Sequence, residues 1–174
     1  MKKILFLLPL VFNLNAFGQI KESSWKTIDE SSYSIQYPEN WELNVSETMG
    51  TSFILLSQQT SAEDKFRANI NLSIQNLEGY YLNLDAYVAI SEEQITKMIT
   101  NGTIIESNRI IIENKTEFQK IIFTGKQGLF QLKFLQYYFI KDEKAYVLTF
   151  TSEASQYEKY NITAEQILES FLLK

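Results

Sequence analysis

Side chains suited to catalysis are scarce in this sequence, which contains no histidine and no cysteine. Histidine is the side chain best suited to moving protons near neutral pH, and cysteine supplies thiolate nucleophiles. A Ser-His-Asp triad is therefore impossible, as are metal sites built on imidazole or thiolate ligands. The sequence predicts a protein that is not an enzyme and that uses no metal or cofactor.

Carboxylates are the remaining candidates for catalysis. Adjacent acidic pairs occur at Glu63-Asp64, Glu92-Glu93 and Asp142-Glu143. Two carboxylates that face each other are enough for a glycosidase-type reaction, so a carboxylate-based hydrolase stays open as a distant alternative. The first and third pairs lie in polar segments, and the second lies opposite the apolar stripe of a predicted helix. We interpret all three as solvated charge.

Uncharged hydrogen-bonding side chains lie at alternate positions of one predicted strand, 66–75. The row consists of Asn69, Asn71, Ser73 and Gln75, and it alternates with Ile70, Leu72 and Ile74. Alternation of this kind predicts a strand with one buried face. The polar face is either an ordinary solvent-facing surface or a surface that hydrogen-bonds a neutral ligand or an added peptide strand.

Aromatic residues raise a similar pair of alternatives. Tyr80 and Tyr81 lie in a predicted loop, where an exposed pair would form a contact patch, and the alternative is that they pack in the core. Trp41 follows a turn at Pro38. Trp41, Tyr37 and Phe130 would line a cavity if the protein carried a small apolar ligand.

Hydrophobic periodicity predicts two helices and a mostly antiparallel sheet. The first helix, 83–101, has Asn83 as its N-cap, Gly102 at its end and an apolar stripe that includes Leu84, Val88, Ile95 and Met98. The second helix begins at Ser155, with Glu158 completing a capping box. The predicted strands are 25–29, 32–37, 42–46, 52–57, 66–75, 103–112, 115–124, 129–140 and 145–152. The last four strands follow one another through short links, which predicts an antiparallel meander. Runs such as 135–140 are apolar on both faces, which predicts that other elements cover both faces of the sheet. The fold class is therefore α+β, an α/β/α sandwich.

The N-terminus and the charge limit the location and the partners. Two lysines, an apolar run at 4–12 and small residues at Ala16 and Gly18 predict a signal peptide at 1–18, followed by a single domain at 19–174. The apolar run is too short to span a membrane, and a lipid anchor would need a cysteine. A net charge of −5 argues against nucleic acid as a partner. We expect export to the periplasm or the medium.

Several segments resemble PsbP-like domains, which include exported bacterial proteins of the DcrB type. The segment from Tyr33 to Trp41 resembles their opening strand and turn, and the segment from Phe66 to Leu72 resembles their central strand. Leu84-Asp85-Ala86-Tyr87 is similar to the start of their middle helix, and the last strand and helix, at 146–149 and 167–171, are similar as well. The resemblance implies the PsbP-like sandwich and an accessory or binding role without a shared catalytic centre.

Taken together, the sequence predicts an exported, non-enzymatic accessory or binding protein that contacts another protein. A carrier of a small apolar ligand or lipid is the alternative. The candidate contact residues are Tyr80, Tyr81, Asn69, Asn71, Ser73 and Trp41.

Overall fold

The structure is a computed structural model of the chain, and it describes residues 24–46, 50–59, 65–112 and 116–174. The predicted signal peptide at 1–18 and the Glu63-Asp64 pair lie outside the described residues.

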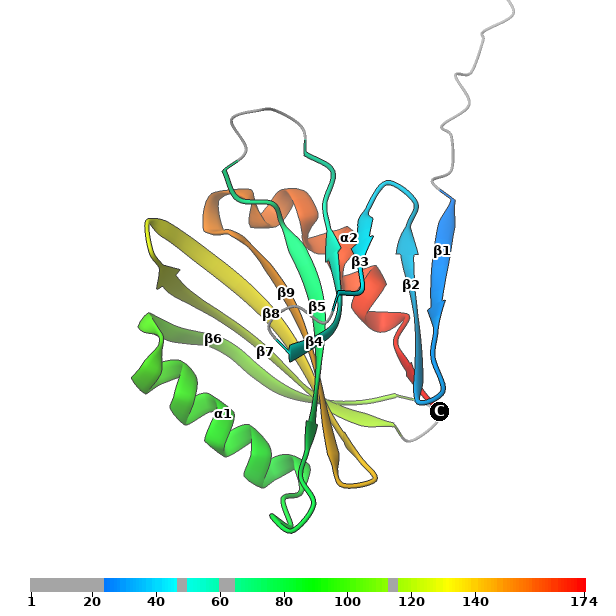
Figure 1. Ribbon diagram of the computed structural model, residues 1–174. Helices are drawn as coiled ribbons and strands as arrows, with labels where there is room; N and C mark the ends of the chain where they lie inside the picture. The colour runs from blue at the N-terminus through cyan, green and yellow to red at the C-terminus, as the bar shows by residue number, and fades with distance from the viewer. Residues whose placement is uncertain (1–23, 47–49, 60–64, 113–115) are drawn as a thin grey trace, which may run out of the picture.

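A seven-stranded antiparallel sheet forms the centre of the fold, in the order β3-β4-β5-β9-β8-β7-β6 (Figure 1). Strands β6 to β9 are joined in sequence, each antiparallel to the next, so the predicted meander is confirmed. The strands are β3 (Glu42–Asn44), β4 (Thr51–Leu56), β5 (Asn69–Asn76), β6 (Thr100–Ile111), β7 (Glu117–Gln127), β8 (Phe130–Lys141) and β9 (Lys144–Glu153).

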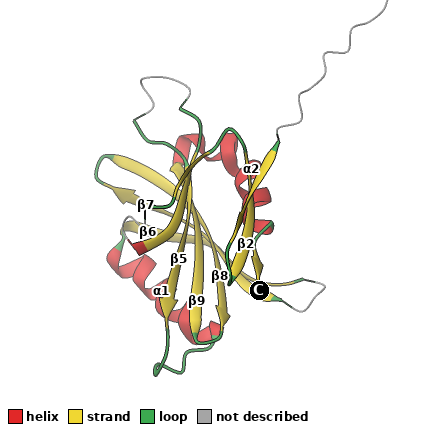
Figure 2. Ribbon diagram, turned by 45° about the vertical axis from the view of Figure 1, so that its right-hand side comes forward, coloured by secondary structure: helices red, strands yellow, loops and turns green. Residues whose placement is uncertain are grey.

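Two helices and a smaller sheet cover the central sheet from opposite sides. Helix α1 (Leu84–Met98) lies on one face, and helix α2 (Tyr157–Glu169) lies on the other beside the small sheet β1-β2-β10 (Figure 2). The small sheet consists of β1 (Trp25–Asp29), β2 (Tyr33–Pro38) and β10 (Leu172–Leu173). The predicted α+β sandwich with two main helices is confirmed.

Each face of the central sheet has its own hydrophobic core. On the α1 face, the buried residues of the core are Leu77, Leu84, Tyr87, Val88, Ile95, Ile121, Phe123, Tyr138, Ala145 and Val147. On the other face, a larger core joins α2, the small sheet and the central strands, and it includes Ile35, Phe53, Leu72, Leu135, Leu148, Phe150 and Ile167. Neighbouring residues of β8 and β9 therefore enter different cores, which is why these strands are apolar on both faces.

The two helices start differently. Asn83 caps α1, since its Oδ1 accepts a hydrogen bond of 2.9 Å from the backbone N–H of Ala86, as the sequence predicts. The predicted capping box of the second helix is wrong. A short 3-10 turn, Ala154–Gln156, precedes α2, and its N-cap, Gln156, makes no side-chain capping bond.

Two glycines allow the end of α1 to lie close to the sheet. Helix α1 ends at Met98, and Gly102 lies within β6, where an added Cβ would be 2.0 Å from the Ile95 carbonyl oxygen. A Cβ on Gly125 of β7 would be 2.4 Å from Ile99 Cγ2. Both distances are far below ordinary contact, so a side chain at Gly102 would have to displace the Ile95 carbonyl, and one at Gly125 would have to displace the Ile99 side chain.

Helix α1 covers only part of its face of the sheet. It packs mainly on β6, β7 and β8, towards one edge. On the same face, Asn69, Asn71 and Ser73 of β5 are half-buried and Gln75 is exposed. The boundary between the covered and the open part of this face lies along α1.

Candidate functional site

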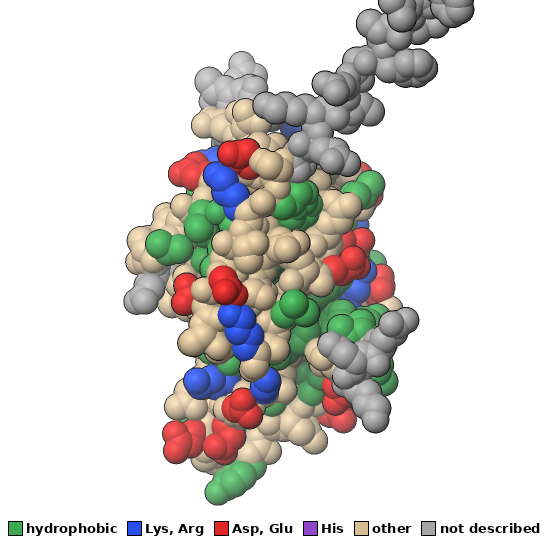
Figure 3. Space-filling view, turned by 90° about the vertical axis from the view of Figure 1, so that its right-hand side faces the viewer, with side chains coloured by type: hydrophobic (Ala, Val, Ile, Leu, Met, Phe, Trp, Pro, Cys, Tyr) green, Lys and Arg blue, Asp and Glu red, His purple; other side chains and the backbone are tan. Residues whose placement is uncertain are grey.

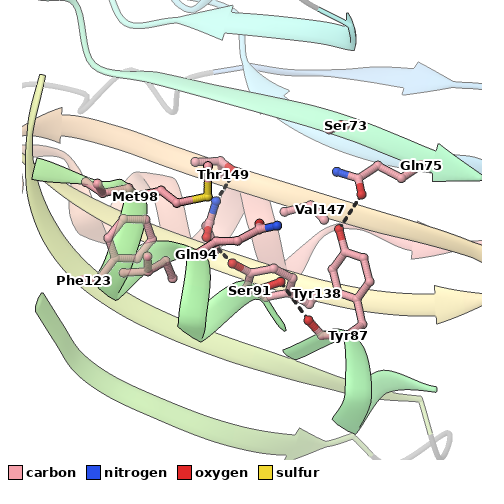
Figure 4. Close-up of a pocket in the computed structure, with 13 residues that line it drawn as sticks. Ser73, Gln75, Tyr87, Ser91, Gln94, Met98, Phe123, Tyr138, Val147 and Thr149 are labelled. Atoms are coloured by element: carbon pink, nitrogen blue, oxygen red, sulfur yellow. Dashed lines mark hydrogen bonds between the residues drawn. The ribbon is translucent and has the colours of Figure 1, made fainter. Parts of the chain in front are cut away.

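A groove runs between α1 and the open part of the sheet. It consists of two adjoining hollows of about 390 and 430 Å³. The hollows share Gln75 of β5 and Tyr87, Ser91 and Gln94 of α1, so they lie next to each other, and we call them together the α1 groove. Strands β8 and β9 form its floor beside β5 (Figure 4).

The described residues that line the α1 groove include no charged side chain. Its apolar part is formed chiefly by Ile95, Ile99, Phe123 and Val147, and its polar part by amides and hydroxyls. The full lining is Ser73, Gln75, Asn76, Leu77, Tyr80, Leu82, Tyr87, Ile90, Ser91, Gln94, Ile95, Met98, Ile99, Phe123, Gln136, Tyr138, Val147 and Thr149. A groove of this composition suits a neutral ligand with both apolar and hydrogen-bonding groups.

Hydrogen bonds within the floor fix several of these polar groups. Gln136 Nε2 donates to Thr149 Oγ1 at 2.9 Å, and Tyr138 Oη donates to Gln136 Oε1. Tyr87 Oη donates to Gln75 Oε1 at 2.8 Å, which connects α1 to β5 across the groove (Figure 4). The floor is therefore preorganised before any ligand arrives.

Other polar groups in the groove remain available to a ligand. Gln75 uses its carbonyl oxygen in the bond to Tyr87, and its Nε2 donates to no other described residue. The side chains of Gln94 and Ser73 likewise form no hydrogen bond with the rest of the described chain. Gln94 extends from α1 over the groove (Figure 4). These amide and hydroxyl groups supply both donors and acceptors.

Two tyrosines of the groove, Tyr87 and Tyr138, stay uncharged at neutral pH. Burial raises the pKa of Tyr87 above the ordinary value for tyrosine. The pKa of Tyr138 is also raised, first by burial and then by the neighbouring Tyr87. Both phenols are therefore protonated donors under physiological conditions.

Exposed apolar side chains form the rim of the groove. Ile90, Gln94 and Met98 lie four residues apart and so occupy one line along α1. Ile90 is 42% exposed and Met98 is 77% exposed. Tyr80, in the loop before α1, is 71% exposed and lies at the end of the groove marked by Leu77 and Leu82. Apolar exposure of this kind beside a groove is typical of a contact surface.

The predicted polar row lies where the sequence placed it, on one face of β5, and part of it belongs to the groove. Ser73 and Gln75 line the groove. Asn69 and Asn71 lie farther along β5, and Asn69 Nδ2 donates to the Arg67 carbonyl oxygen at 3.1 Å. Their role in binding stays a prediction.

Tyr80 and Tyr81 are both exposed, so they are not part of a core. Only Tyr80 lines the groove, whereas Tyr81 is 92% exposed beside it. Tyr81 has a φ of 53°, a left-handed conformation that is unfavourable for a bulky side chain. The backbone of this loop therefore holds an aromatic ring in solvent at some conformational cost.

Trp41 lies in the core and not on the contact surface predicted for it. It is 6% exposed and packs in the larger core together with Tyr37. Phe130 packs against Phe66, with 5.4 Å between ring centroids. Trp41 and Tyr37 therefore fill the core, and none of the three residues lines one of the five hollows described in the structure.

The sequence reasoning missed the contribution of α1 and β8. The sequence predicts Met98 in the buried stripe of the helix, but it lies on the groove side, where no described element covers it. Gln136 lies in a run that is otherwise apolar on both faces. A single glutamine in such a run was the available signal, since a buried amide needs hydrogen-bonding partners.

The two described acidic pairs belong to different elements, α1 and the turn between β8 and β9, and neither lines the α1 groove. Glu93 forms an ion pair with Lys97 at 2.5 Å, and Glu92 accepts a hydrogen bond from Ser107 Oγ. Asp142 and Glu143 form the turn between β8 and β9. Within the described ranges, no three residues of the His, Cys, Asp and Glu types are grouped so that they could hold a metal ion. No helix in the same ranges is long and apolar enough to cross a membrane.

Comparison with solved structures identifies the fold as PsbP-like. No protein-family model matches the sequence, and no curated protein matches it. The solution structure of cyanobacterial PsbP (CyanoP) from Synechocystis sp. PCC 6803 is similar with a TM-score of 0.64 and 10% identity, covering 92% of this chain and 99% of that one.

Two bacterial structures share the same fold. PA94 from Pseudomonas aeruginosa, a protein of unknown function, has a TM-score of 0.61 and 12% identity, over 86% of this chain and 97% of that one. LpqN of Mycobacterium tuberculosis, which is involved in cell envelope biogenesis, has a TM-score of 0.59 and 8% identity, over 88% of this chain and 92% of that one. The resemblance seen in the sequence is therefore confirmed at the level of the fold.

Proposed function

We propose that this chain is an exported, non-enzymatic accessory protein that binds an uncharged segment of another protein in the α1 groove. The observation that carries the proposal is the groove itself, which is open, uncharged and bordered by the exposed side chains of Tyr80, Ile90 and Met98. Tyrosine and methionine are enriched at protein interfaces, and charged residues are depleted at interface centres.

The chemistry of the lining favours a peptide over a purely apolar ligand. A peptide segment presents backbone N–H and C=O groups together with side chains, and each buried backbone group needs a partner. The amides of Gln75 and Gln94 and the hydroxyl of Ser73 supply such partners, while Phe123 and Val147 supply apolar contact. The elongated shape, along one side of a helix, suits an extended segment.

Export is supported by the N-terminal sequence, with its two lysines, apolar run and small residues before position 19. The absence of histidine and cysteine from the whole sequence supports a role without catalysis. LpqN, with the same fold, is involved in cell envelope biogenesis, and a role at the cell envelope fits an exported binding protein.

Site-specific photo-cross-linking tests the proposal. A photoreactive phenylalanine analogue replaces Gln94 in the groove or, as the control, Ile162, which is 70% exposed on α2 on the opposite face. We expect one discrete adduct from the Gln94 position in the exporting cell and none from Ile162. The substitution Met98→Lys should remove the adduct, because it places a charge at the rim of an uncharged groove.

Mass spectrometry of the cross-linked peptide then identifies the bound segment. The proposal requires an uncharged segment of one protein. Adducts of equal yield at both positions, or an adduct that Met98→Lys leaves unchanged, would show that the groove is not the binding site.

A carrier of a small ligand is the second candidate, favoured by a separate crevice on the opposite face of the sheet.

A further inference from the structure

A crevice of about 300 Å³ lies on the face of the sheet that carries α2. It separates the end of α2 and β10 from the ends of β6, β7 and β8, and it shares no lining residue with the α1 groove. We call it the aromatic crevice. The residues that line it are Ile110, Ile112, Thr116, Phe118, Tyr137, Phe139, Leu168, Glu169, Phe171, Leu172 and Leu173.

Four aromatic rings form its wall. The ring centroid of Phe118 lies 4.6 Å from that of Tyr137 and 5.0 Å from that of Phe139, and Phe171 lies 5.3 Å from Phe139. All four side chains are at most 7% exposed, so their surface towards the crevice is shielded from bulk water. An aromatic face carries partial negative charge and attracts a cation, most strongly where water is excluded.

A carboxylate supplies the only charge of the described lining. Glu169 forms no ion pair or hydrogen bond through its side chain with any described residue, and the described lining of the crevice includes no lysine or arginine. One turn earlier on α2, Glu165 already has a partner, since Lys120 Nζ lies 2.7 Å from its Oε1. A carboxylate that has no partner among the described residues and lies beside an aromatic wall favours a positive ligand.

The negative field reaches into the crevice. The pKa of Tyr137 is raised, first by burial, then by the charges of Glu165 and Glu169. The phenol of Tyr137 therefore stays neutral and adds no charge of its own. The burial and the negative charges that raise the pKa of Tyr137 also disfavour the binding of an anion in the crevice.

Size and exposure limit the ligand further. The volume is at the lower end of the range for small-molecule sites, so a long acyl chain does not fit within it. Ile112 and Leu172 are 42% and 55% exposed, so apolar surface continues to the opening. On the side of the molecule that bears β1, β2 and the C-terminus, apolar side chains gather in the lower right of the space-filling view, with acidic ones nearby (Figure 3).

We propose that the aromatic crevice binds a small, free organic cation of the alkylammonium class. Its compact apolar headgroup lies against Phe118, Tyr137, Phe139 and Phe171, and its charge faces Glu169. Methylated ammonium groups fit this description, because their charge is spread over an apolar surface and carries a small desolvation cost. The inference is independent of the α1 groove and of any protein partner.

A comparison of two probes of equal shape tests the role of charge. Choline is the cationic probe, and 3,3-dimethyl-1-butanol is its neutral isostere, titrated separately into the isotopically labelled chain and followed by NMR. We expect choline to shift the backbone signals of Ile110 and Leu172, and its methyl protons to move upfield because they lie on aromatic rings. The isostere should bind at least about fivefold more weakly, which corresponds to one ion contact at a partly exposed site.

Two matched variants separate the crevice from general surface charge. Glu169→Gln should weaken choline binding about fivefold and leave isostere binding unchanged. Glu78→Gln, which removes the same charge in the loop before α1, should change neither. Leu172→Trp, which narrows the exposed opening, should weaken both probes, and circular dichroism checks that each variant is folded.

Any of the following results would overturn the proposal. The first is equal affinity for choline and its isostere, which would make the crevice a site for neutral ligands. The second is choline binding that Glu169→Gln leaves unchanged, or no choline binding at millimolar concentration. The third is binding to phosphatidylcholine vesicles without binding to free choline, which would make the ligand a lipid surface.

Discussion

The contact between Gly125 on β7 and Ile99 at the end of α1 determines how closely the helix approaches the sheet. An added Cβ at Gly125 would lie 2.4 Å from Ile99 Cγ2, whereas carbon atoms in contact are about 3.5–4.0 Å apart. Gly125→Ala therefore displaces Ile99 by about 1 Å or more. We expect this overpacking to lower the free energy of unfolding by about 1–3 kcal/mol.

Removing the obstructing methyl group should abolish or reverse the destabilisation caused by Gly125→Ala. In an Ile99→Ala background, Gly125→Ala meets no close side-chain atom, because the next nearest atom outside Ile99 is the Thr100 carbonyl oxygen at 3.7 Å. Alanine is favoured over glycine within a strand by about 0.5–1 kcal/mol, so the same substitution should now be neutral or stabilising.

Urea unfolding of the four proteins, followed by tryptophan fluorescence, measures the coupling directly. We expect a shift of the midpoint with an unchanged m-value. Equal costs of Gly125→Ala in both backgrounds would refute the reasoning, since they would mean that Ile99 is not what the new methyl group meets.

Three further predictions concern the core, the pH dependence and the loop before α1. Phe150→Ala, at a fully buried position, should cost about 3–5 kcal/mol in urea unfolding, whereas Leu129→Ala, at a 95% exposed position, should cost less than about 0.5 kcal/mol; similar costs would contradict the assignment of the core. Because the pKa of Tyr138 is raised by burial, the unfolded state loses this proton first, so stability should fall as the pH rises above about 10, and Tyr138→Phe should make the fall measurably shallower. Tyr81→Gly should leave the thermal unfolding midpoint unchanged or raise it, because it relieves the left-handed strain at φ 53°; a lower midpoint would mean that the exposed ring makes stabilising contacts.

Most of the fold could be predicted from the sequence, because its signals are local. The alternation of Ile70, Leu72 and Ile74 with polar residues locates β5, and the cap at Asn83 locates the start of α1. The double-sided apolar run in β8 correctly indicated that the sheet is covered on both faces. Period, capping and turn residues act over a few positions, so one sequence is enough to recognise them.

The start of α2 and the exact place of Gly102 could not be predicted in the same way. Ser155 and Glu158 have the spacing of a capping box, but the chain continues from β9 through a 3-10 turn and enters the helix at Tyr157. Gly102 has the composition of a helix end, but it is needed because the backbone passes close to the Ile95 carbonyl. Both outcomes depend on tertiary packing rather than on local preference.

The candidate site was predicted only in part for a related reason. The polar row of β5 and the exposure of Tyr80 follow from local pattern, whereas the opposite wall of the groove depends on how α1 lies across the sheet. Met98 was expected in the core because helical spacing places it near Ile95. A helix that covers only part of a sheet leaves one side of its apolar stripe exposed. The position of the helix on the sheet cannot be predicted from the residues of the helix alone.

Strand β8 belongs to both proposed sites, since Tyr138 faces the α1 groove and its neighbour Tyr137 faces the aromatic crevice. Any movement of β8 therefore alters both sites at the same time, because the strand contributes to the wall of each. If a cation in the crevice changes the affinity of the groove for its partner, the partner must change the affinity for the cation by the same factor. The hydrogen-exchange rates of the amides of β8 would report occupancy at either face, so a single strand could serve as the common sensor of two unlike ligands.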